Sequence, residues 1–384
     1  MEQPPPQQPE IEEARRLSWG DLPEEIIMEI LVRVSGRFRA QLKCVNKSLL
    51  SLIDKPRFAR EILDKINKSV DKDKYRGLVL SEQNNGGYLV RSVALSGGDV
   101  SLGEFDFPPE DNKLCSKTLH LFNTCHGLVC VAHQGSLYVW NPTTRECRQV
   151  TECVANQDLF GIGFDPVSDD YKIMVAPSRR YFRCQSYQVP KVFSLKNNSW
   201  RLVQGFPDRS FPYEISYGTH ATTINEIAHW DATEKIICWA NRTIQRKKRI
   251  VYFDFTNEEM GTLPLPYDDD DDGMITSLAA FSGCLSMIHY NGTVADDLWI
   301  MEEYGVKESW MKLLTIDNLF VEDLALIPLC WMGDEIVLGV EGEPFLIIYN
   351  PMERTHRRLE LCGVNPRSTI IPLLDTLISP NATA

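Results

Sequence analysis

The sequence lacks the features that mark membrane-spanning and secreted proteins. It contains no run of about 18 apolar residues, so it predicts no membrane-spanning helix. The N-terminal stretch MEQPPPQQPEIEEARR has no apolar segment, and we therefore expect no secretory signal. The 11 cysteines have no paired spacing. Without export, free thiols in a reducing compartment are expected, which predicts a protein of the cytoplasm, the nucleus or both.

Positive charge is also scarce. The chain has 40 Lys and Arg against 53 Asp and Glu, giving a net charge of -13 at pH 7. This balance argues against nucleic-acid and membrane partners and favours basic proteins. The charge is uneven, because residues 1–19 carry -2 and residues 20–70 carry +3, which leaves -14 on the rest of the chain. We therefore expect the acidic surface to lie on the C-terminal part of the protein.

Recognisable catalytic motifs are missing as well. The sequence has no GxSxG, no P-loop and no HExxH, so it predicts no catalytic residue and no cofactor. One short segment holds five residues of metal-ligand type, namely His120, Cys125, His126, Cys130 and His133. The two cysteines do not form a CxxC pair, and valines flank the second one. Buried thiols and turn histidines are therefore expected here rather than a zinc site.

Three charged runs are candidate sites, each with a simpler structural explanation. Asp165, Asp169 and Asp170 are predicted to form a turn, since no base or nucleophile accompanies them for catalysis. The run Asp268–Asp272 lacks the spacers of a calcium loop. It is predicted to be a solvated loop, with a surface for a basic partner as the alternative. Gln245–Arg249 is predicted to be a charged hairpin tip, with a nuclear import signal as the alternative.

The chain divides into a tail, a small helical head and a large β body. Residues 1–17 are rich in Pro, Gln and Glu and are predicted to be disordered. Residues 18–66, the head, hold apolar residues at helical spacing, which predicts a bundle of three helices. A core of this size supplies only about 3–5 kcal/mol, so a partner or a neighbouring domain is expected to stabilise it.

Residues 75–375, the body, change to an apolar period of two, with Gly, Asn, Asp and Pro between short strands. Five units share one plan, in which an apolar strand is followed by a polar turn and a second strand. Their anchor residues, 46 to 60 positions apart, are Trp140, Phe193, Phe253, Trp299 and Tyr349. A spacing of roughly 50 predicts kelch-like β-propeller blades. With the region 75–125 added, the sequence predicts a mainly β fold with about six blades.

The head resembles an F-box. The matching pieces, in order, are Leu22-Pro23-Glu24-Glu25, Ile30-Leu31, Lys43-Cys44-Val45, Lys47-Ser48 and Ser51-Leu52-Ile53. F-box helices dock on a Skp-type linker protein, so the resemblance implies a linker-binding surface. The residues expected to form it are Leu22, Pro23, Ile26, Ile30, Leu31, Leu42, Cys44, Val45, Leu49, Leu52 and Ile53. Aspartate at Leu31 and Leu52 is expected to abolish linker binding.

The body is similar to the plant F-box-associated domain. The segments that carry this likeness are Asn123–Cys130, Trp140–Glu146, Gly161–Met174 and Val192–Arg201, with weaker matches further on. Together, the two resemblances imply a substrate-recognition subunit of an SCF-type (cullin–RING) ubiquitin ligase. The head would bind the linker and, through it, a cullin, and the propeller would bind a protein destined for degradation. Ubiquitin transfer would occur elsewhere in the complex, so the chain is not expected to be an enzyme.

Within the family, the chain is similar to the S-locus F-box proteins of pollen. Those proteins bind ribonucleases of the style, which are often basic, and an acidic body would suit such a partner. The resemblance therefore suggests a role in self-incompatibility, with a basic ribonuclease as the substrate.

The head departs from the usual F-box pattern at three places. Val34-Ser35 replaces a usual Leu-Pro pair, Arg39-Ala40 replaces Leu-Leu, and Leu49 replaces Trp. Loss of an interface aromatic can cost about 2 kcal/mol, so linker binding is expected to be weak, selective for one linker, or lost. The alternative function is an interaction scaffold with a decayed F-box. A propeller enzyme would need convergent carboxylates or histidines at the mouth of the ring, which the sequence does not show.

Overall fold

The computed structural model describes most of the head and body. The described residues are 22–34, 36–45, 47–53, 55–68, 74–83, 87–96, 99–105, 119–133, 135–151, 159–176, 190–203, 213–215, 221–238, 243–267, 274–290, 295–317 and 325–381. The predicted tail at 1–17 and the run Asp268–Asp272 lie outside them. No helix among the described residues is long and apolar enough to cross a bilayer.

Within its described residues, the head contains four helices rather than the three predicted. They are α1 (Glu24–Arg33), α2 (Gly36–Leu42), α3 (Lys47–Ile53) and α4 (Pro56–Lys68). The second predicted helix is divided by a tight turn, in which the Cys44 N–H donates to the Gln41 carbonyl (2.9 Å) and the Val45 N–H donates to the Leu42 carbonyl (3.1 Å). Val45 is β-branched and Asn46 follows it, and both residue types have low helix propensity. The apolar period continues across this break, which is why the pattern predicted one helix.

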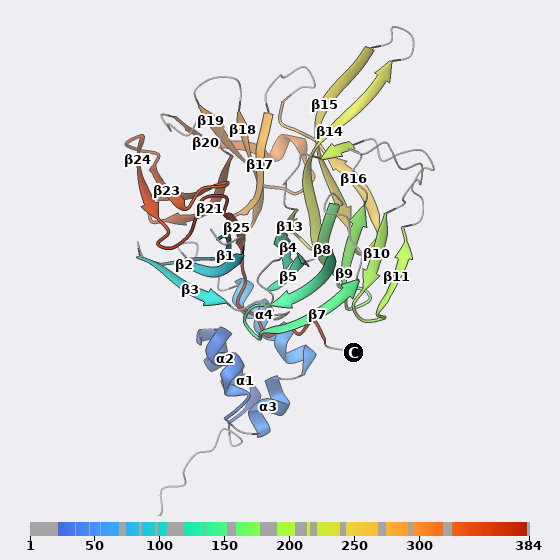
Figure 1. The fold of residues 1–384 in the computed structure, drawn as a ribbon, viewed down its shortest axis with the longest axis vertical. Helices are drawn as coiled ribbons and strands as arrows, with labels where there is room; N and C mark the ends of the chain where they lie inside the picture. The colour runs from blue at the N-terminus through green and yellow to red at the C-terminus, as the bar shows by residue number, and fades with distance from the viewer. Residues whose placement is uncertain are drawn as a thin grey trace, which may run out of the picture.

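The described strands form six sheets, which we call blades 1 to 6 in chain order (Figure 1). The strands of each blade are given outward from the centre. Blade 1 consists of β25 (Thr369–Pro372), β1 (Lys74–Glu82), β2 (Tyr88–Ser96) and β3 (Asp99–Phe105), and blade 2 of β4 (Leu119–Cys125), β5 (Leu128–His133), β6 (Ser136–Asn141) and β7 (Glu146–Thr151). Blade 3 consists of β8 (Leu159–Asp165), β9 (Asp170–Ala176), β10 (Lys191–Ser194) and β11 (Ser199–Leu202).

Blade 4 has five strands, and blades 5 and 6 have four each. In blade 4, β12 (Tyr213–Ile215) and β13 (Thr222–Ile224) both pair with β14 (Ile227–Cys238), which is followed by β15 (Thr243–Asp254) and β16 (Glu259–Leu263). Blade 5 consists of β17 (Met274–Phe281), β18 (Cys284–Tyr290), β19 (Asp296–Met301) and β20 (Trp310–Ile316). Blade 6 consists of β21 (Leu326–Met332), β22 (Glu335–Val340), β23 (Phe345–Asn350) and β24 (Thr355–Glu360). A 3-10 turn, Lys307–Ser309, precedes β20.

The predicted fold class, a helical head followed by a propeller of about six blades, is confirmed. The five anchor residues all lie on the third strand of their blades, namely β6, β10, β15, β19 and β23. Four of them, Trp140, Phe193, Phe253 and Tyr349, are buried. The sequence repeat therefore reflects packing between blades: each four-stranded sheet is covered on both faces by its neighbours, and the large anchor residue is buried there.

The ring is closed by strands from opposite ends of the chain. Strand β25 pairs with β1 in antiparallel register from Leu80↔Thr369 to Gly77↔Pro372. Polar side chains also join different blades near the centre: Asn123 Nδ2 donates to Thr223 Oγ1 at 2.8 Å, and Thr222 Oγ1 donates to the Leu278 carbonyl at 2.9 Å. These bonds link blade 2 to blade 4 and blade 4 to blade 5, so the inner strands are connected across blade boundaries.

Candidate functional site

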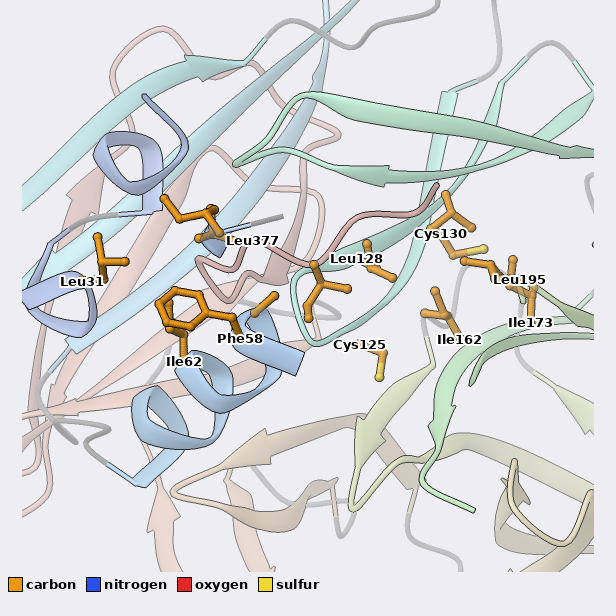
Figure 2. Close-up of a cluster of buried hydrophobic side chains, with 14 of the residues drawn as sticks. Leu31, Phe58, Ile62, Cys125, Leu128, Cys130, Ile162, Ile173, Leu195 and Leu377 are labelled. Carbon is orange, nitrogen blue, oxygen red and sulfur yellow. The ribbon is translucent and has the colours of Figure 1, made fainter. Parts of the chain in front are cut away.

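The head shares one hydrophobic core with the propeller. Side chains from α1, α3 and α4 pack in the same buried cluster as residues of blades 2 and 3 and of the segment after β25. Figure 2 shows Leu31, Phe58 and Ile62 of the head in the same cluster as Leu128 of blade 2 and Leu377 of the segment that follows β25. The predicted need for a neighbouring domain is thus met within the chain.

This shared core divides the eleven residues expected to bind a linker. Those that are buried are Leu31, Leu49, Leu52 and Ile53; those that are half-buried are Leu22, Ile30 and Leu42; and those that are exposed are Pro23, Ile26, Cys44 and Val45. A fully buried side chain cannot contact a partner in this conformation. The four buried leucine and isoleucine residues therefore act as core, and aspartate at Leu31 or Leu52 would disrupt the fold rather than report on binding.

Large apolar side chains are nevertheless exposed on the head. Ile26 is 47% exposed, Phe38 63%, Val45 57% and Leu50 40%. Phe38 and Leu50 were not among the predicted residues, since an apolar residue in a short helix gives no sequence signal for the side that it faces. A groove of about 440 Å³ also opens between α1 and α3, lined by Leu22, Glu24, Ile27, Lys47, Ser48, Leu49, Ser51, Leu52 and Lys55. None of the four exposed side chains lines this groove; the groove and the four side chains together are the candidate docking surface of the head.

The orientation of this surface is fixed by residues 373–381, which we call the C-terminal strap. Asp375 of the strap accepts hydrogen bonds from the Gly36 N–H (3.3 Å) and from Thr143 Oγ1 (2.9 Å), and it forms an ion pair with Arg76. Arg39 of α2 donates to the Asp375 backbone carbonyl at 2.6 Å. Asp375 therefore joins the head to blades 1 and 2.

The start of α2 lies so close to the strap that it requires glycine. A Cβ added at Gly36 would lie 2.7 Å from Thr143 Cγ2 and 2.9 Å from Asp375 Cγ. Arg39 follows one turn later and is buried, at the place where F-boxes usually have leucine. Burial, together with the nearby Arg76, lowers the pKa of the Arg39 guanidinium to about 10, so this group is still charged at neutral pH. The departure from the F-box pattern at Arg39 is thus part of the contact with the strap.

Further polar contacts hold the strap along blade 2. Asn141 Nδ2 donates to the carbonyls of Thr376 (3.2 Å) and Ile378 (2.7 Å), and Thr376 Oγ1 donates to the His126 carbonyl (2.7 Å). Arg148 Nη1 donates to the Pro380 carbonyl at 3.2 Å. Asn141 lies in Trp140–Glu146, one of the segments that carry the likeness to the F-box-associated domain, so part of that segment serves to bind the strap.

The segment with five metal-ligand residue types lies at this junction. Cys125 and Cys130 are buried in the shared core, and burial raises the pKa of both thiols, that of Cys130 to about 12. Burial lowers the pKa of His126 to about 4, although the negative charge of Asp64 acts to raise it. The His126 Nδ1 atom lies 3.1 Å from the Tyr171 hydroxyl. Within the described residues no group of three His, Cys, Asp or Glu side chains comes together as metal ligands would.

The predicted acidic turn joins β8 to β9, and its carboxylates have structural partners. Asp165 accepts from the Val167 N–H (2.9 Å) and from Lys172 Nζ (2.7 Å). Asp170 accepts from the Lys196 N–H at 2.8 Å, and Asp169 forms an ion pair with Arg60 of the head. The turn therefore closes a hairpin and meets α4.

Lys172 links this turn to the next blade. Its Nζ is buried and also contacts Glu258 Oε1 (2.8 Å) and the Phe255 carbonyl (3.0 Å) of blade 4. Burial alone would raise the pKa of Asp165, but the hydrogen bonds from Lys172, Ser168 and Val167 outweigh it and bring the pKa to about 2. Arg201 also forms an ion pair with Glu258, so two cations compensate the two carboxylates, as buried ions require.

Comparison with known proteins identifies both parts of the chain. Residues 19–61 match the F-box domain, and residues 79–360 match the F-box associated beta propeller domain. The F-box/kelch-repeat protein At3g23880 of Arabidopsis thaliana is 28% identical over 383 residues, which cover 94% of this chain and 96% of that protein. F-box protein CPR1 of the same plant is 24% identical over 321 residues, or 77% of this chain and 73% of that protein.

Among solved structures, the chain is similar to one in the crystal structure of a nidogen/laminin complex, with a TM-score of 0.45 and 9% identity over 79% of this chain and 99% of that chain. The propeller family matches well over half of the sequence, and the F-box precedes it. The protein therefore belongs to the family of F-box proteins with an F-box associated beta propeller domain, which are proteins of the substrate-adaptor type.

Proposed function

We propose that this chain is the substrate receptor of an SCF-type, cullin–RING ubiquitin ligase. The exposed apolar face of the head would bind a Skp-type linker and, through it, a cullin. The propeller would bind the protein to be ubiquitinated, in the cytoplasm or the nucleus. The observation that carries the proposal is that Ile26, Phe38, Val45 and Leu50 remain exposed although the head has a complete core shared with the body.

The fixed orientation of the head supports this role. A receptor acts by holding target lysines near the charged conjugating enzyme, so its contribution is proximity. Proximity is most effective when the two binding surfaces are held at a constant distance and angle. The shared core and the strap provide such a connection, because they join the head to blades 1, 2 and 3.

The test is affinity purification of the full chain from plant cells after proteasome inhibition, read by mass spectrometry. Recovery of a Skp-type linker and a cullin is expected, with target proteins enriched when the proteasome is inhibited. A matched variant with Phe38→Asp and Leu50→Asp should lose linker and cullin together. A well-folded chain that recovers neither partner would instead favour the alternative, an interaction scaffold with a decayed F-box.

The narrower hypothesis of an S-locus F-box protein concerns the substrate alone. Its support is the general likeness of the sequence and the charge of -14 outside residues 1–70, which would attract a basic ribonuclease. A pull-down with style ribonucleases, using a non-style ribonuclease of similar charge as the control, tests it. Equal recovery of both ribonucleases, or of neither, would reject the hypothesis and leave the receptor role standing.

A further inference from the structure

The hairpin of β14 and β15 extends beyond its blade. Its register is continuous over both twelve-residue strands, from Ile227↔Asp254 to Cys238↔Thr243. Strand β16, however, pairs with β15 only from Ile250 to Asp254. Figure 1 shows the two strands projecting from the rim of the propeller on the side away from the helical head. Among the described strands, none pairs with the outer edge of β15 from Thr243 to Arg249, which we call the free edge.

The free edge carries the basic run of the sequence. The run was predicted to be the tip of a hairpin, but it lies within β15 and begins two residues after Thr243, where the pairing with β14 ends. Arg246, Lys247, Lys248 and Arg249 follow one another there, and Arg249 Nε lies 3.1 Å from Glu234 Oε2 in an ion pair. Alternation along the strand places Arg246 and Lys248 on the opposite face from that ion pair.

Arg246 and Lys248 are available to a ligand. Arg246 is exposed, Lys248 is half-buried, and within the described residues neither side chain forms a hydrogen bond or an ion pair. A ribbon of two strands is only marginally stable in water, so a third strand on the free edge would stabilise the hairpin.

Two explanations fit a basic edge strand. Charges on an edge discourage pairing with other chains, and a single lysine can do this. Arg246 and Lys248 are two cations without a partner among the described residues, which is more than protection of the edge requires, and an acidic ligand would pair with them. A peptide matches the site better than a nucleic acid does, because the free edge offers main-chain donors and acceptors and the rest of the chain is strongly acidic.

We propose that the free edge of β15 binds an extended acidic segment of a partner protein as an added β-strand. Main-chain hydrogen bonds to Thr243–Arg249 hold the segment, and Arg246 and Lys248 select for its carboxylates. The inference rests on the proposed receptor function and deepens it, since it assigns a chemical class to the segment by which a target is recognised.

The experiment measures fluorescence anisotropy of short labelled peptides with the purified full chain. A peptide of alternating Thr and Glu should bind, and binding should weaken as salt is added. A peptide of alternating Thr and Lys should not bind. An N-methylated version of the acidic peptide, which lacks alternate main-chain donors, should bind markedly more weakly. Equal binding of the methylated peptide would overturn strand addition, and tighter binding of a single-stranded oligonucleotide would overturn the choice of a protein ligand.

The variant Arg246→Ser/Lys248→Ser should weaken binding of the acidic peptide about tenfold, the loss expected for two charged surface contacts. The control Lys191→Ser/Lys196→Ser also removes two positive charges, one from β10 of blade 3 and one from the turn between β10 and β11. This control should bind the acidic peptide like the parent protein. No peptide binding, or equal loss in both variants, would contradict the inference and leave the cations as protection of the edge. Linker binding by the same preparations tests the receptor function separately, because the free edge and the head do not share residues.

Discussion

The head and the propeller bury their apolar side chains in different ways. Blades 4 to 6 pack against their neighbours, so the apolar residues of one blade are covered by the next. The head instead completes its core with blades 2 and 3 and with the C-terminal strap. The comparison indicates that the propeller can stabilise itself, whereas the head depends on the propeller. It also explains how a short helical segment can keep apolar residues exposed for a partner.

The largest expected effect comes from breaking the propeller between two blades. Lys172→Met leaves the buried Asp165 without its cation and leaves Glu258 with Arg201 alone, and removal of one partner from a buried ion pair costs about 3–5 kcal/mol. Chemical denaturation should show this loss. Lys191→Met, on an exposed position of β10, should stay within about 0.5 kcal/mol of the parent protein. Equal stabilities of the two variants would show that blades 3 and 4 do not depend on this link.

Loss of the strap contact should loosen the head and spare the distant blades. Asp375→Ala removes the ion pair with Arg76 and the bonds from Gly36 and Thr143, a loss of about 1.5–3 kcal/mol for bonds to a charged group. Amide hydrogen exchange should become faster in α1–α4 and remain unchanged in blade 5. Asp334→Ala, at an exposed turn of blade 6, serves as the control. Faster exchange throughout the propeller would contradict the division between head and body.

Acid should weaken the junction through His126. The folded protein lowers the pKa of this histidine to about 4 from an ordinary value of 6.5, so the unfolded chain takes up a proton first as pH falls. The contribution of neutral His126 is complete above about pH 6.5 and falls by about 2 kcal/mol by pH 5. His126→Gln should therefore lose less stability than the parent protein between pH 7 and pH 5. An unchanged pH dependence would show that His126 is not responsible.

The smallest effect is expected when Arg39 is returned to the usual F-box residue. Arg39 Nε and Nη1 are buried without hydrogen-bond partners among the described residues, while Nη2 binds the Asp375 carbonyl. In Arg39→Leu, removal of a buried charge compensates for the lost bond, so stability should change by less than about 1 kcal/mol. Arg39→Ala also loses packing and should be less stable than Arg39→Leu. The reverse order in thermal melts would show that the charge itself stabilises the head.

The sequence predicted what repeats and missed what connects distant parts. The anchors from Trp140 to Tyr349 revealed the blades, because each blade needs the same large residue on its third strand. The pairing of β25 with β1 and the contact of Arg39 with Asp375 join residues more than 280 positions apart, and neither has a local pattern.

The candidate site shows the same limit. Helical spacing identified the apolar residues of the head, but spacing does not tell core from contact surface. Leu49 and Leu50 are neighbours with the same side chain, yet Leu49 is 1% exposed and Leu50 is 40% exposed. The difference is set by α4, the strap and two blades, which lie elsewhere in the sequence.

The central claim is that the residues left exposed by the shared core bind a Skp-type linker. The most direct test is calorimetric titration of the purified chain with such a linker. Phe38→Asp/Leu50→Asp should weaken binding at least about 30-fold, the effect of losing 2 kcal/mol at an interface hot spot, without lowering the melting temperature. The matched variant Leu202→Asp/Met352→Asp, at exposed apolar positions of the propeller, should bind like the parent protein. Equal binding by both variants, or no binding by the folded parent protein, would contradict the claim.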